Sequence, residues 1–355
     1  MMKNENKIDP VRGREGSQRP SASNGIDFLA IGDIVIDAFI RLKDAHVHCK
    51  IDTDACELCL RFGDKVPYES VTVIPAVGNS PNAAVSAARL GLRSALITHI
   101  GNDKHGQDCL ESLNNDKVIT DHVVTEKEKT TNYHYVLSYD VDRTILIKHT
   151  KFDYEFPKLA GASWVYLSSL AENSLPYHDE ILKYLNDNPN TKLAFQPGTF
   201  QIKFGIEALK NIYQRTEIFF GNVEEAEIIL GKLSTSQVDN FLELAKGIQA
   251  LGPKIVVISD GPNGAYLYLN DELWQMPIYP DIASPKERTG AGDAFSSTFV
   301  AALALGKTPL EALAWGPINS MSVVQEIGAQ KGLLAREKLE EYLQNAPENY
   351  KARKV

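Results

Sequence analysis

Residues 287–295 read Glu-Arg-Thr-Gly-Ala-Gly-Asp-Ala-Phe, and a small, apolar stretch without proline follows them from Ser296 to Leu305. This composition predicts a helix that begins near Ala291. The first backbone N–H groups of a helix have no acceptor within the helix, and together with the helix dipole they form a ready site for an anion. The turn of Gly290, Ala291 and Gly292 therefore predicts a phosphate-binding site.

Asp293 falls in the first turn of this predicted helix, beside any anion that the turn would bind. A carboxylate next to a phosphate is electrostatically unfavourable unless it has a task, such as taking the proton from an attacking hydroxyl group. Asp is also common at helix N-termini, where it interacts favourably with the helix dipole. The motif alone leaves the catalytic and the structural interpretation open.

Short apolar runs elsewhere in the chain have the length and composition of buried strands. They occur at 26–31, 95–97, 164–167, 193–195, 218–220 and 254–258. Segments with helical periodicity separate most of them, at 81–90, 177–185, 224–230 and 238–251. Strands that alternate with helices predict an α/β fold, with a mostly parallel sheet covered by helices on both faces.

Two stretches interrupt this alternation, from about 38 to 76 and from about 118 to 150. Both contain apolar residues with a period of two, which is typical of strands with one apolar and one polar face. We expect the two stretches to form one small antiparallel lid on a single domain that spans residues 26–355. Residues 1–25 have almost no large apolar side chains, which predicts a disordered tail.

The composition excludes several classes of protein. The chain has 355 residues, with 37 Lys and Arg against 46 Asp and Glu, and a net charge of −9. This charge argues against nucleic acid or an anionic membrane as the main partner. Four cysteines are too few for a disulfide scaffold, and neither a membrane-spanning run nor a secretory signal is found. We expect a cytoplasmic enzyme or binding protein.

Four motifs together resemble those of the PfkB/ribokinase family of carbohydrate and nucleoside kinases. Residues 287–295 are similar to its C-terminal signature, D-T-x-G-A-G-D-x-F. The other three are Gly32-Asp33-x-x-x-Asp37, the run from Gly78-Asn79-Ser80-Pro81-Asn82 to Gly101-Asn102-Asp103-Lys104-His105-Gly106, and Asn222-x-x-Glu225. Their order and separation match the family from residue 26 to about 333. The resemblance implies a ribokinase-like fold, in which a small antiparallel β lid accompanies the α/β sheet.

The resemblance also implies a role for each matching residue. Asp293 would be the general base, and the N–H groups of Gly290, Ala291, Gly292 and Asp293 would stabilise charge on the transferred γ-phosphoryl group. The sugar-binding residues would be Asp37, Gly78, Asn79 and Asn82. Residues near the nucleotide would be Asn222, Ser259, Asp260, Gly261, Gly264, Thr289 and Asn319, the last of them near the adenine. Asn222 and Glu225 would position Mg²⁺ and its waters.

The implied activity is transfer of the γ-phosphoryl group of ATP to a hydroxyl group of a small sugar. A nucleoside kinase, a sugar-phosphate kinase and a non-catalytic sugar or nucleotide sensor are the alternatives. Glu287 replaces the leading Asp of the signature, which in relatives often helps to hold a monovalent cation, so K⁺ as a cofactor stays open. Exposed lid edges also make a homodimer through the lid plausible.

Several lid residues allow more than one interpretation. A structural zinc ion or ordinary lid side chains would both account for His46, His48, Cys49, Cys56 and Cys59, and the unusual spacing favours the second. Tyr133, His134 and Tyr135 would close over a base or a sugar ring, or else simply belong to the lid strand. Arg143 and Lys148 would bind an anionic substrate or be solvated charges, and we favour solvated charges.

Overall fold

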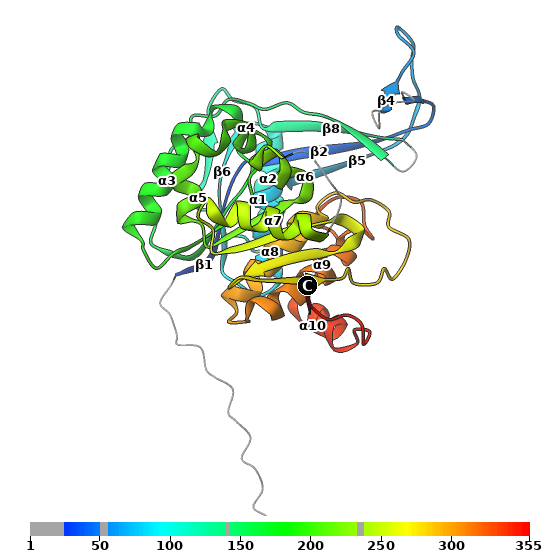
Figure 1. The fold of residues 1–355 in the computed structure, drawn as a ribbon. Helices are drawn as coiled ribbons and strands as arrows, with labels where there is room; N and C mark the ends of the chain where they lie inside the picture. Colours follow the sequence, from blue (N-terminus) through cyan, green and yellow to red (C-terminus); the bar gives the residue numbers. More distant parts are fainter. Residues whose placement is uncertain (1–24, 50–55, 140–141, 233–237) are drawn as a thin grey trace, which may run out of the picture.

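The computed structural model describes residues 25–49, 56–139, 142–232 and 238–355. The predicted disordered tail, apart from Gly25, lies outside the described residues. The described chain forms a ten-stranded sheet with helices on both faces and a smaller sheet at one side (Figure 1). This arrangement confirms the α/β fold with a small lid. In the described residues we find no helix that is both long enough and apolar enough to cross a membrane.

The large sheet is parallel over most of its width. From β7 to β13 every neighbouring pair of strands runs parallel, whereas β14, β15 and β16 add antiparallel strands at one edge. In spatial order the strands are β16 (Arg353–Lys354), β15 (Glu272–Met276), β14 (Ala265–Leu269), β13 (Ile255–Ser259), β12 (Ile218–Asn222), β11 (Lys192–Phe195), β10 (Ala162–Leu167), β1 (Ile26–Ile31), β6 (Ser94–Gly101) and β7 (Val123–Glu126).

Helices cover both faces of this sheet and bury its alternating side chains. The helices are α1 (Asn79–Arg89), α2 (Lys104–Asn115), α3 (Leu175–Asp187), α4 (Thr199–Ala208), α5 (Lys210–Arg215), α6 (Val223–Leu230), α7 (Val238–Ala250), α8 (Ala291–Ala304), α9 (Pro309–Val323) and α10 (Arg336–Gln344), with short 3₁₀ turns at Glu172–Ser174 and Gly261–Asn263. Phe28 and Ala30 of β1 pack in the core with α1, α8 and α9. Leu29 and Ile31 pack with α3, α5 and α7 on the opposite face, because successive strand residues point to opposite sides.

The lid consists of a four-stranded sheet and a two-stranded hairpin. The sheet has the order β5 (Tyr68–Val77), β2 (Val35–Leu42), β8 (Asn132–Tyr139) and β9 (Asp142–Leu146), and the hairpin pairs β3 (His46–Cys49) with β4 (Cys56–Cys59). Two of the three pairings in the sheet are antiparallel, and β2 runs parallel to β8. The hairpin extends away from the α/β body (Figure 1).

The second lid segment is shorter than the expected range of about 118 to 150. After α2 the chain first adds β7 to the edge of the large sheet, with Thr98 of β6 opposite Val123. Only then does it enter the lid at β8. The two-residue periodicity of this stretch is common to both sheets, so periodicity could not show where one ended and the other began.

The pairing register assigns the lid side chains to two faces. Ala38 of β2 lies opposite Val73 and Tyr135, and side chains in register across a sheet share a face. Val73 and Tyr135 are exposed, so this face is the outer one. Asp37, the preceding residue, lies opposite Ile74 and His134 and points to the other face. The inner face of the lid therefore carries Asp37 and His134.

Candidate active site

The turn before α8 has the conformation that an anion site needs. Gly290 has φ 81°, in the left-handed region, and immediately precedes the helix. A Cβ atom on Gly290 would lie 2.3 Å from the Cβ atom of Ala329, so glycine is required there. A Cβ atom on Gly292 would meet no atom within 4 Å, so the turn is open on that side. The predicted helix start near Ala291 is confirmed.

Asp293 lies in the first turn of α8 and is 9% exposed. Its carboxylate accepts hydrogen bonds from three side-chain amides: Asn79 Nδ2 at 2.8 Å, Asn82 Nδ2 at 2.9 Å and Gln196 Nε2 at 3.2 Å. Burial raises the pKa of Asp293, and these amides partly offset the rise. The fold thus brings Asp293 together with Asn79 and Asn82, which are more than 200 residues away in the sequence.

Three further hydrogen bonds fix the orientation of Gln196 and Asn82. Gln196 Oε1 accepts from the hydroxyl groups of Tyr166 and Ser296, which leaves its NH₂ group directed at Asp293. Gln330 Nε2 donates to Asn82 Oδ1 at 3.0 Å and fixes Asn82 in the same way. Neither glutamine was predicted from the sequence. Gln196 directly follows β11, at the strand end where ligand sites of α/β sheets form, so its position offered a signal; Gln330 offered none.

The substrate turn at the start of α1 adjoins Asp37. Gly78 has φ 121°, and a Cβ atom there would lie 2.8 Å from the carbonyl oxygen of Asp33. The turn follows directly on β5, which pairs with β2, the strand of Asp37. Asp37 and the two asparagines of this turn therefore lie on neighbouring elements. Carboxylate and amide groups supply both acceptors and donors, which suits the adjacent hydroxyl groups of a sugar.

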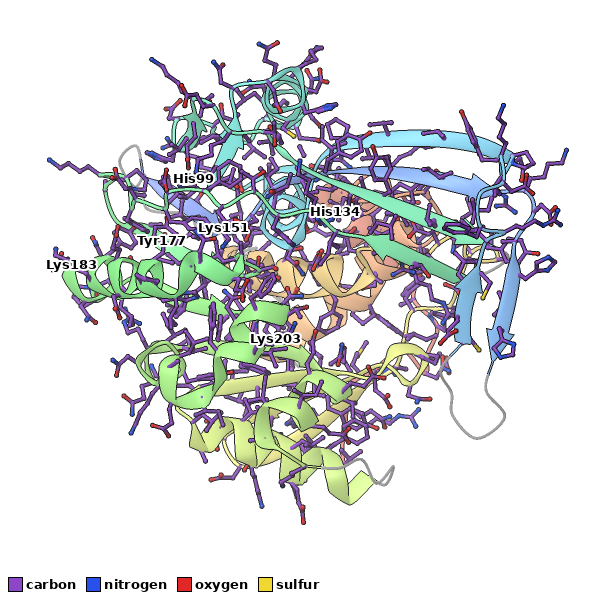
Figure 2. The ribbon with its side chains drawn as sticks, turned by 90° about the horizontal axis from the view of Figure 1, so that it is seen from above. His99, His134, Lys151, Tyr177, Lys183 and Lys203 are labelled. Atoms are coloured by element: carbon purple, nitrogen blue, oxygen red, sulfur yellow. The ribbon has the colours of Figure 1, made fainter. Side chains whose placement is uncertain are left out.

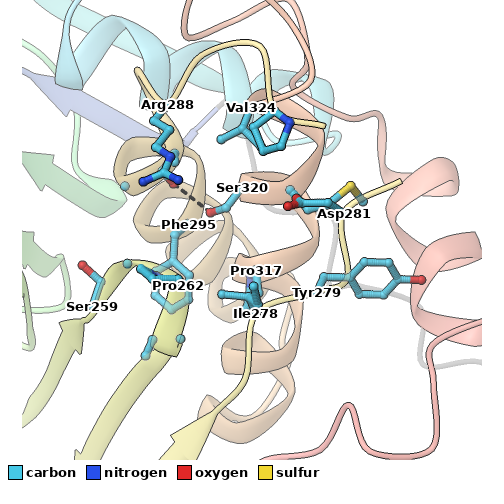
Figure 3. Close-up of a pocket in the computed structure, with 17 residues that line it drawn as sticks. Ser259, Pro262, Ile278, Tyr279, Asp281, Arg288, Phe295, Pro317, Ser320 and Val324 are labelled. Carbon is cyan, nitrogen blue, oxygen red and sulfur yellow. Dashed lines mark hydrogen bonds between the residues drawn. The ribbon is translucent and has the colours of Figure 1, made fainter. Parts of the chain in front are cut away.

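An apolar cavity of about 330 Å³ lies on one side of the first turn of α8 (Figure 3). Ser259, Gly261 and Gly264, which were predicted near the nucleotide, line it. Pro262, from the same predicted turn, forms part of its apolar wall. The rest of the wall was not predicted near the nucleotide and consists of Ile278, Tyr279, Phe295, Pro317, Met321 and Val324. A cavity of this size and polarity suits a planar aromatic group such as a nucleobase.

A second, smaller cavity of about 170 Å³ lies on the other side of Gly292, which lines both. Asn222 and Glu225 line it together with Gln196. Asn222 Oδ1 accepts from the N–H of Glu225 at 2.8 Å, and Glu225 Oε2 accepts from the N–H of Asn222 at 2.9 Å. This capping box begins α6, so the two residues also have a structural role. Burial raises the pKa of Glu225, and the nearby charge of Asp293 adds to the rise.

The donor set of this small cavity fits a magnesium ion with its waters. Mg²⁺ prefers oxygen ligands and keeps several waters, so one amide and one carboxylate can hold it through those waters. The capping bond uses Oε2 of Glu225, which leaves Oε1 for a metal-bound water. Two features support a magnesium site here: the oxygen donors of Asn222 and Glu225, and the position of the cavity beside Gly292 of the anion turn.

Comparison with known proteins identifies the family. The profile of the pfkB family of carbohydrate kinases matches residues 47–336. The chain belongs to this family. Ribokinase of Bacillus subtilis is 27% identical over 291 residues, which cover 80% of this chain and 92% of that protein. The 5-dehydro-2-deoxygluconokinase of Geobacillus thermodenitrificans is 23% identical over 340 residues, which cover 90% and 94%. The protein is therefore a carbohydrate kinase.

The carbohydrate kinase also shares its fold with solved structures. The structure of Arabidopsis thaliana ribokinase in complex with ribose and ATP superposes with a TM-score of 0.74, at 19% identity, over 90% of this chain and 99% of that one. This likeness confirms the expected ribokinase-like fold.

Asn319, which was predicted near an adenine, does not line the apolar cavity. It is fully buried, where its Nδ2 donates to Thr298 Oγ1 at 2.7 Å and its Oδ1 accepts from the N–H of Leu334 at 2.9 Å. The next two residues of α9, Ser320 and Met321, line the apolar cavity. Ser320 also donates to the carbonyl of Ala291 at 2.7 Å (Figure 3). Asn319 itself does not reach the cavity because the helix turns this residue toward the core.

Two other predicted nucleotide residues support the site from beside the cavities. Asp260 shapes the turn after β13: its N–H donates to Gly264 O at 2.8 Å, and its Oδ2 accepts from Asn263 at 3.0 Å. The side chain thus holds the glycine turn that lines the apolar cavity.

Thr289 has a buried hydroxyl oxygen without a hydrogen-bond partner among the described residues. A buried hydroxyl of this kind favours a ligand group nearby.

Arg143, a positively charged residue of the lid, lies beside the loop that precedes α8. Arg143 Nε lies 3.9 Å from Glu287 Oε1, and Glu287 Oε2 accepts from the N–H of Gly328 at 2.9 Å. Arg143 thus links the lid to the motif loop, rather than extending alone into solvent as favoured above. Lys148 is exposed. It lines an outer cavity together with Tyr133 and Tyr135.

The hairpin residues do not assemble a metal site within the described part of the chain. No group of three or more His, Cys, Asp or Glu side chains suitable for a metal is found there. His46 and His48 are exposed. Cys56 is disulfide-bonded and so supplies no thiolate to a zinc ion, whereas Cys59 is a free thiol. The side chain of Cys49 lies outside the described residues.

Asp33 predicts a measurable pH dependence of stability. Burial raises its pKa to about 7 from 3.8, although Tyr154 donates to Oδ1 at 2.7 Å. The unfolded chain releases this proton near pH 4 and the folded kinase near pH 7, so Asp33 lowers stability progressively across that window. We expect Asp33→Asn to raise the free energy of unfolding by about 2–4 kcal/mol at pH 8 and by little at pH 4. Urea unfolding of wild type and Asp33→Asn at pH 8 and pH 4 measures these differences. An equal increase in the free energy of unfolding at both pH values would contradict the prediction.

Proposed function

We propose that this protein is an ATP-dependent kinase that transfers the γ-phosphoryl group of ATP to a hydroxyl group of a small neutral sugar. The carrying observation is the position of Asp293: its buried carboxylate lies in the first turn of α8, between the substrate turn and the two cavities beside Gly292. We also propose a cytoplasmic location, where ATP is abundant.

Asp293 would take the proton from the attacking sugar hydroxyl. Its carboxylate now accepts from Asn79, Asn82 and Gln196, and an incoming hydroxyl would replace one of these donors. The raised pKa of Asp293 makes it a stronger base than an exposed carboxylate, which favours proton transfer near neutral pH. Asp37 and the freed asparagine amide would then orient the remaining hydroxyl groups.

The nucleotide would lie across the first turn of α8. The apolar cavity would hold the base, and the N–H groups at the start of the helix would bind the phosphates and the charge that develops during transfer. Mg²⁺, when bound near Asn222 and Glu225, would neutralise phosphate charge. Glu287 contacts Arg143 and the N–H of Gly328, so we do not include K⁺ in the proposal.

The acceptor side favours a neutral sugar over the alternatives. A sugar-phosphate kinase would need a basic residue in the substrate turn, where Asn79 instead donates to Asp293. A nucleoside kinase was expected to use the lid aromatics, but the tilted rings of Tyr133 and Tyr135 contact each other beside an outer cavity, on the face opposite Asp37. A non-catalytic sensor would not need a buried base held by three amides.

A substrate panel tests the proposal. Release of ADP is measured with pentoses, hexoses, sugar phosphates and nucleosides, each with ATP and Mg²⁺. We expect turnover with one or more neutral sugars. Turnover with nucleosides or sugar phosphates alone would assign the corresponding alternative, and ATP binding without turnover on any of them would favour the sensor.

Arg288 provides a test of the nucleotide site. The motif contains this residue, but no role was predicted for it. This exposed residue lines the apolar cavity beside Gly292, where its charge would attract the triphosphate. We expect Arg288→Gln to raise KM for ATP by about three- to tenfold, and the effect to shrink with added salt. Steady-state kinetics at two salt concentrations measure this. Lys286→Gln, which removes a charge paired with Glu326 at 3.6 Å, is the control and should have the wild-type KM.

We further propose that two kinase chains associate through their lids. The outer face of the lid sheet carries Val71, Val73, Tyr135 and Leu146, each at least 44% exposed. A continuous row of exposed apolar residues on a sheet is typical of a protein interface. Sedimentation equilibrium measures the association, and a monomer at all concentrations would contradict it.

A further inference from the structure

Asp37 and His134 are neighbours on the inner face of the lid. They lie directly opposite each other in the parallel pairing of β2 with β8. His134 Nδ1 is 3.5 Å from Asp37 Oδ1, and the two side chains are 14% and 13% exposed. Figure 2 shows His134 near the base of the lid, where its strands leave the α/β body.

A second imidazole packs against His134. The ring of His149, from the segment after β9, meets that of His134 edge to face, with centroids 5.3 Å apart. The other side of His149 packs against Phe200 of α4, at 5.7 Å. Lys203 Nζ in turn lies 5.4 Å from the centre of the Phe200 ring. Side chains from the lid and from the α/β body thus meet here.

These side chains carry buried polar atoms without hydrogen bonds. Asp37 Oδ1, His134 Nε2 and His149 Nδ1 are all buried, and none has a hydrogen-bond partner among the described residues. A buried polar atom without a partner costs free energy, and most such atoms in proteins are paired. Three of them, on side chains that contact one another in succession, indicate that a polar ligand completes the cluster.

We propose that His134 and His149, together with Asp37, bind hydroxyl groups of the sugar that do not react, and so determine which sugar the kinase accepts. This inference rests on the proposed function, because Asp37 is the residue assigned there to the acceptor. His134 would contact the sugar directly, and His149 would fix its ring orientation and contribute its own Nδ1.

The chemistry of the cluster favours hydroxyl groups over an anionic group. A neutral imidazole offers one donor and one acceptor, which matches a hydroxyl group, whereas a carboxylate or phosphate accepts only. Burial lowers the pKa of His149, and the neighbouring His134 adds to the lowering, which favours the neutral ring of His149. The carboxyl group of Asp37 lies beside His134 and would repel an anionic substrate, while Lys203 lies over the Phe200 ring.

The test compares His134→Leu with His134→Gln. We expect His134→Leu to raise KM for the preferred sugar by about ten- to a hundredfold, with kcat within about threefold, because one buried hydrogen bond is lost. His134→Gln keeps a donor and an acceptor and should recover part of the affinity. His48→Gln, on the hairpin away from the body (Figure 1), should match wild type. An unchanged KM in His134→Leu, or a lower kcat with unchanged KM, would overturn the inference.

Deoxy sugars separate recognition from a structural role. If His134 binds a hydroxyl group, then one monodeoxy analogue should be bound equally well by wild type and His134→Leu, whereas the parent sugar should distinguish them. Equal losses for the parent and every analogue would indicate a structural role and overturn the inference, as would a preference of wild type for sugar acids. Calorimetric titration with ATP is run alongside: if wild type binds ATP but neither binds nor phosphorylates any sugar, the proposed function fails as well.

Discussion

Asp293→Asn should lower kcat by about 10²- to 10⁴-fold, the usual contribution of a general base. Asn has nearly the same shape as Asp but cannot take the proton of the sugar hydroxyl. The carboxylate is buried among Asn79, Asn82 and Gln196, so water cannot readily substitute for it. Single-turnover measurements of ADP formation at saturating sugar and ATP would give this value.

Binding and folding measurements make the result specific to catalysis. Calorimetric titration should show the Kd for ATP of Asp293→Asn within about threefold of wild type, since the cavity for the base lies on the other side of Gly292. Asp108→Asn removes a surface carboxylate that pairs with Lys104 at 2.6 Å and should have wild-type activity. Wild-type kcat in Asp293→Asn would rule out this residue as the base.

Gly292→Val should abolish most ATP binding without destabilising the protein. A Cβ atom at this position meets nothing within 4 Å, and replacing glycine in a helix does not reduce helix propensity. Gly292 lines both cavities, and the phosphates would lie beside it, against the first N–H groups of α8. We expect Kd for ATP to rise by at least about tenfold, measured by calorimetric titration, with an unchanged thermal midpoint.

Gly290 is the matched contrast on the same turn. Its φ of 81° and the closeness of Ala329 leave no room for a side chain, so Gly290→Ala should destabilise the fold by about 1–3 kcal/mol. One glycine would thus be required for binding and the other for folding. If Gly292→Val bound ATP as wild type does, the anion turn would not be the phosphate site.

Local chemistry explains why much of the fold was predictable. Strands such as 218–220 are short, apolar and flanked by helical periodicity, and α8 begins at Ala291 because Gly290 ends the preceding loop. The antiparallel edge was not predicted. There β14 and β15 join through Asn270 and Asp271, which have φ 51° and 61°, as a two-residue hairpin turn requires.

The site was predictable where a motif places residues on one turn, and not where tertiary contacts decide. Asn79, Asn82 and Asp293 belong to motifs, and the fold brings them within hydrogen-bonding distance. Gln330 belongs to no motif, since only packing places it beside Asn82. Packing also decides the place of Asn319: a single helical residue can face the cavity or the core, and the sequence alone does not show that Asn319 faces the core.

Transfer of labelled phosphate measures the central claim most directly. The kinase is incubated with Mg²⁺, neutral sugars and ATP whose three non-bridging γ oxygens are ¹⁸O, and the products are analysed by mass spectrometry. We expect ADP and a sugar phosphate that carries all three labelled oxygens, with its ester oxygen coming from the sugar. Asp293→Asn should lose this product. Inorganic phosphate as the sole labelled product, or an undiminished yield from Asp293→Asn, would contradict it.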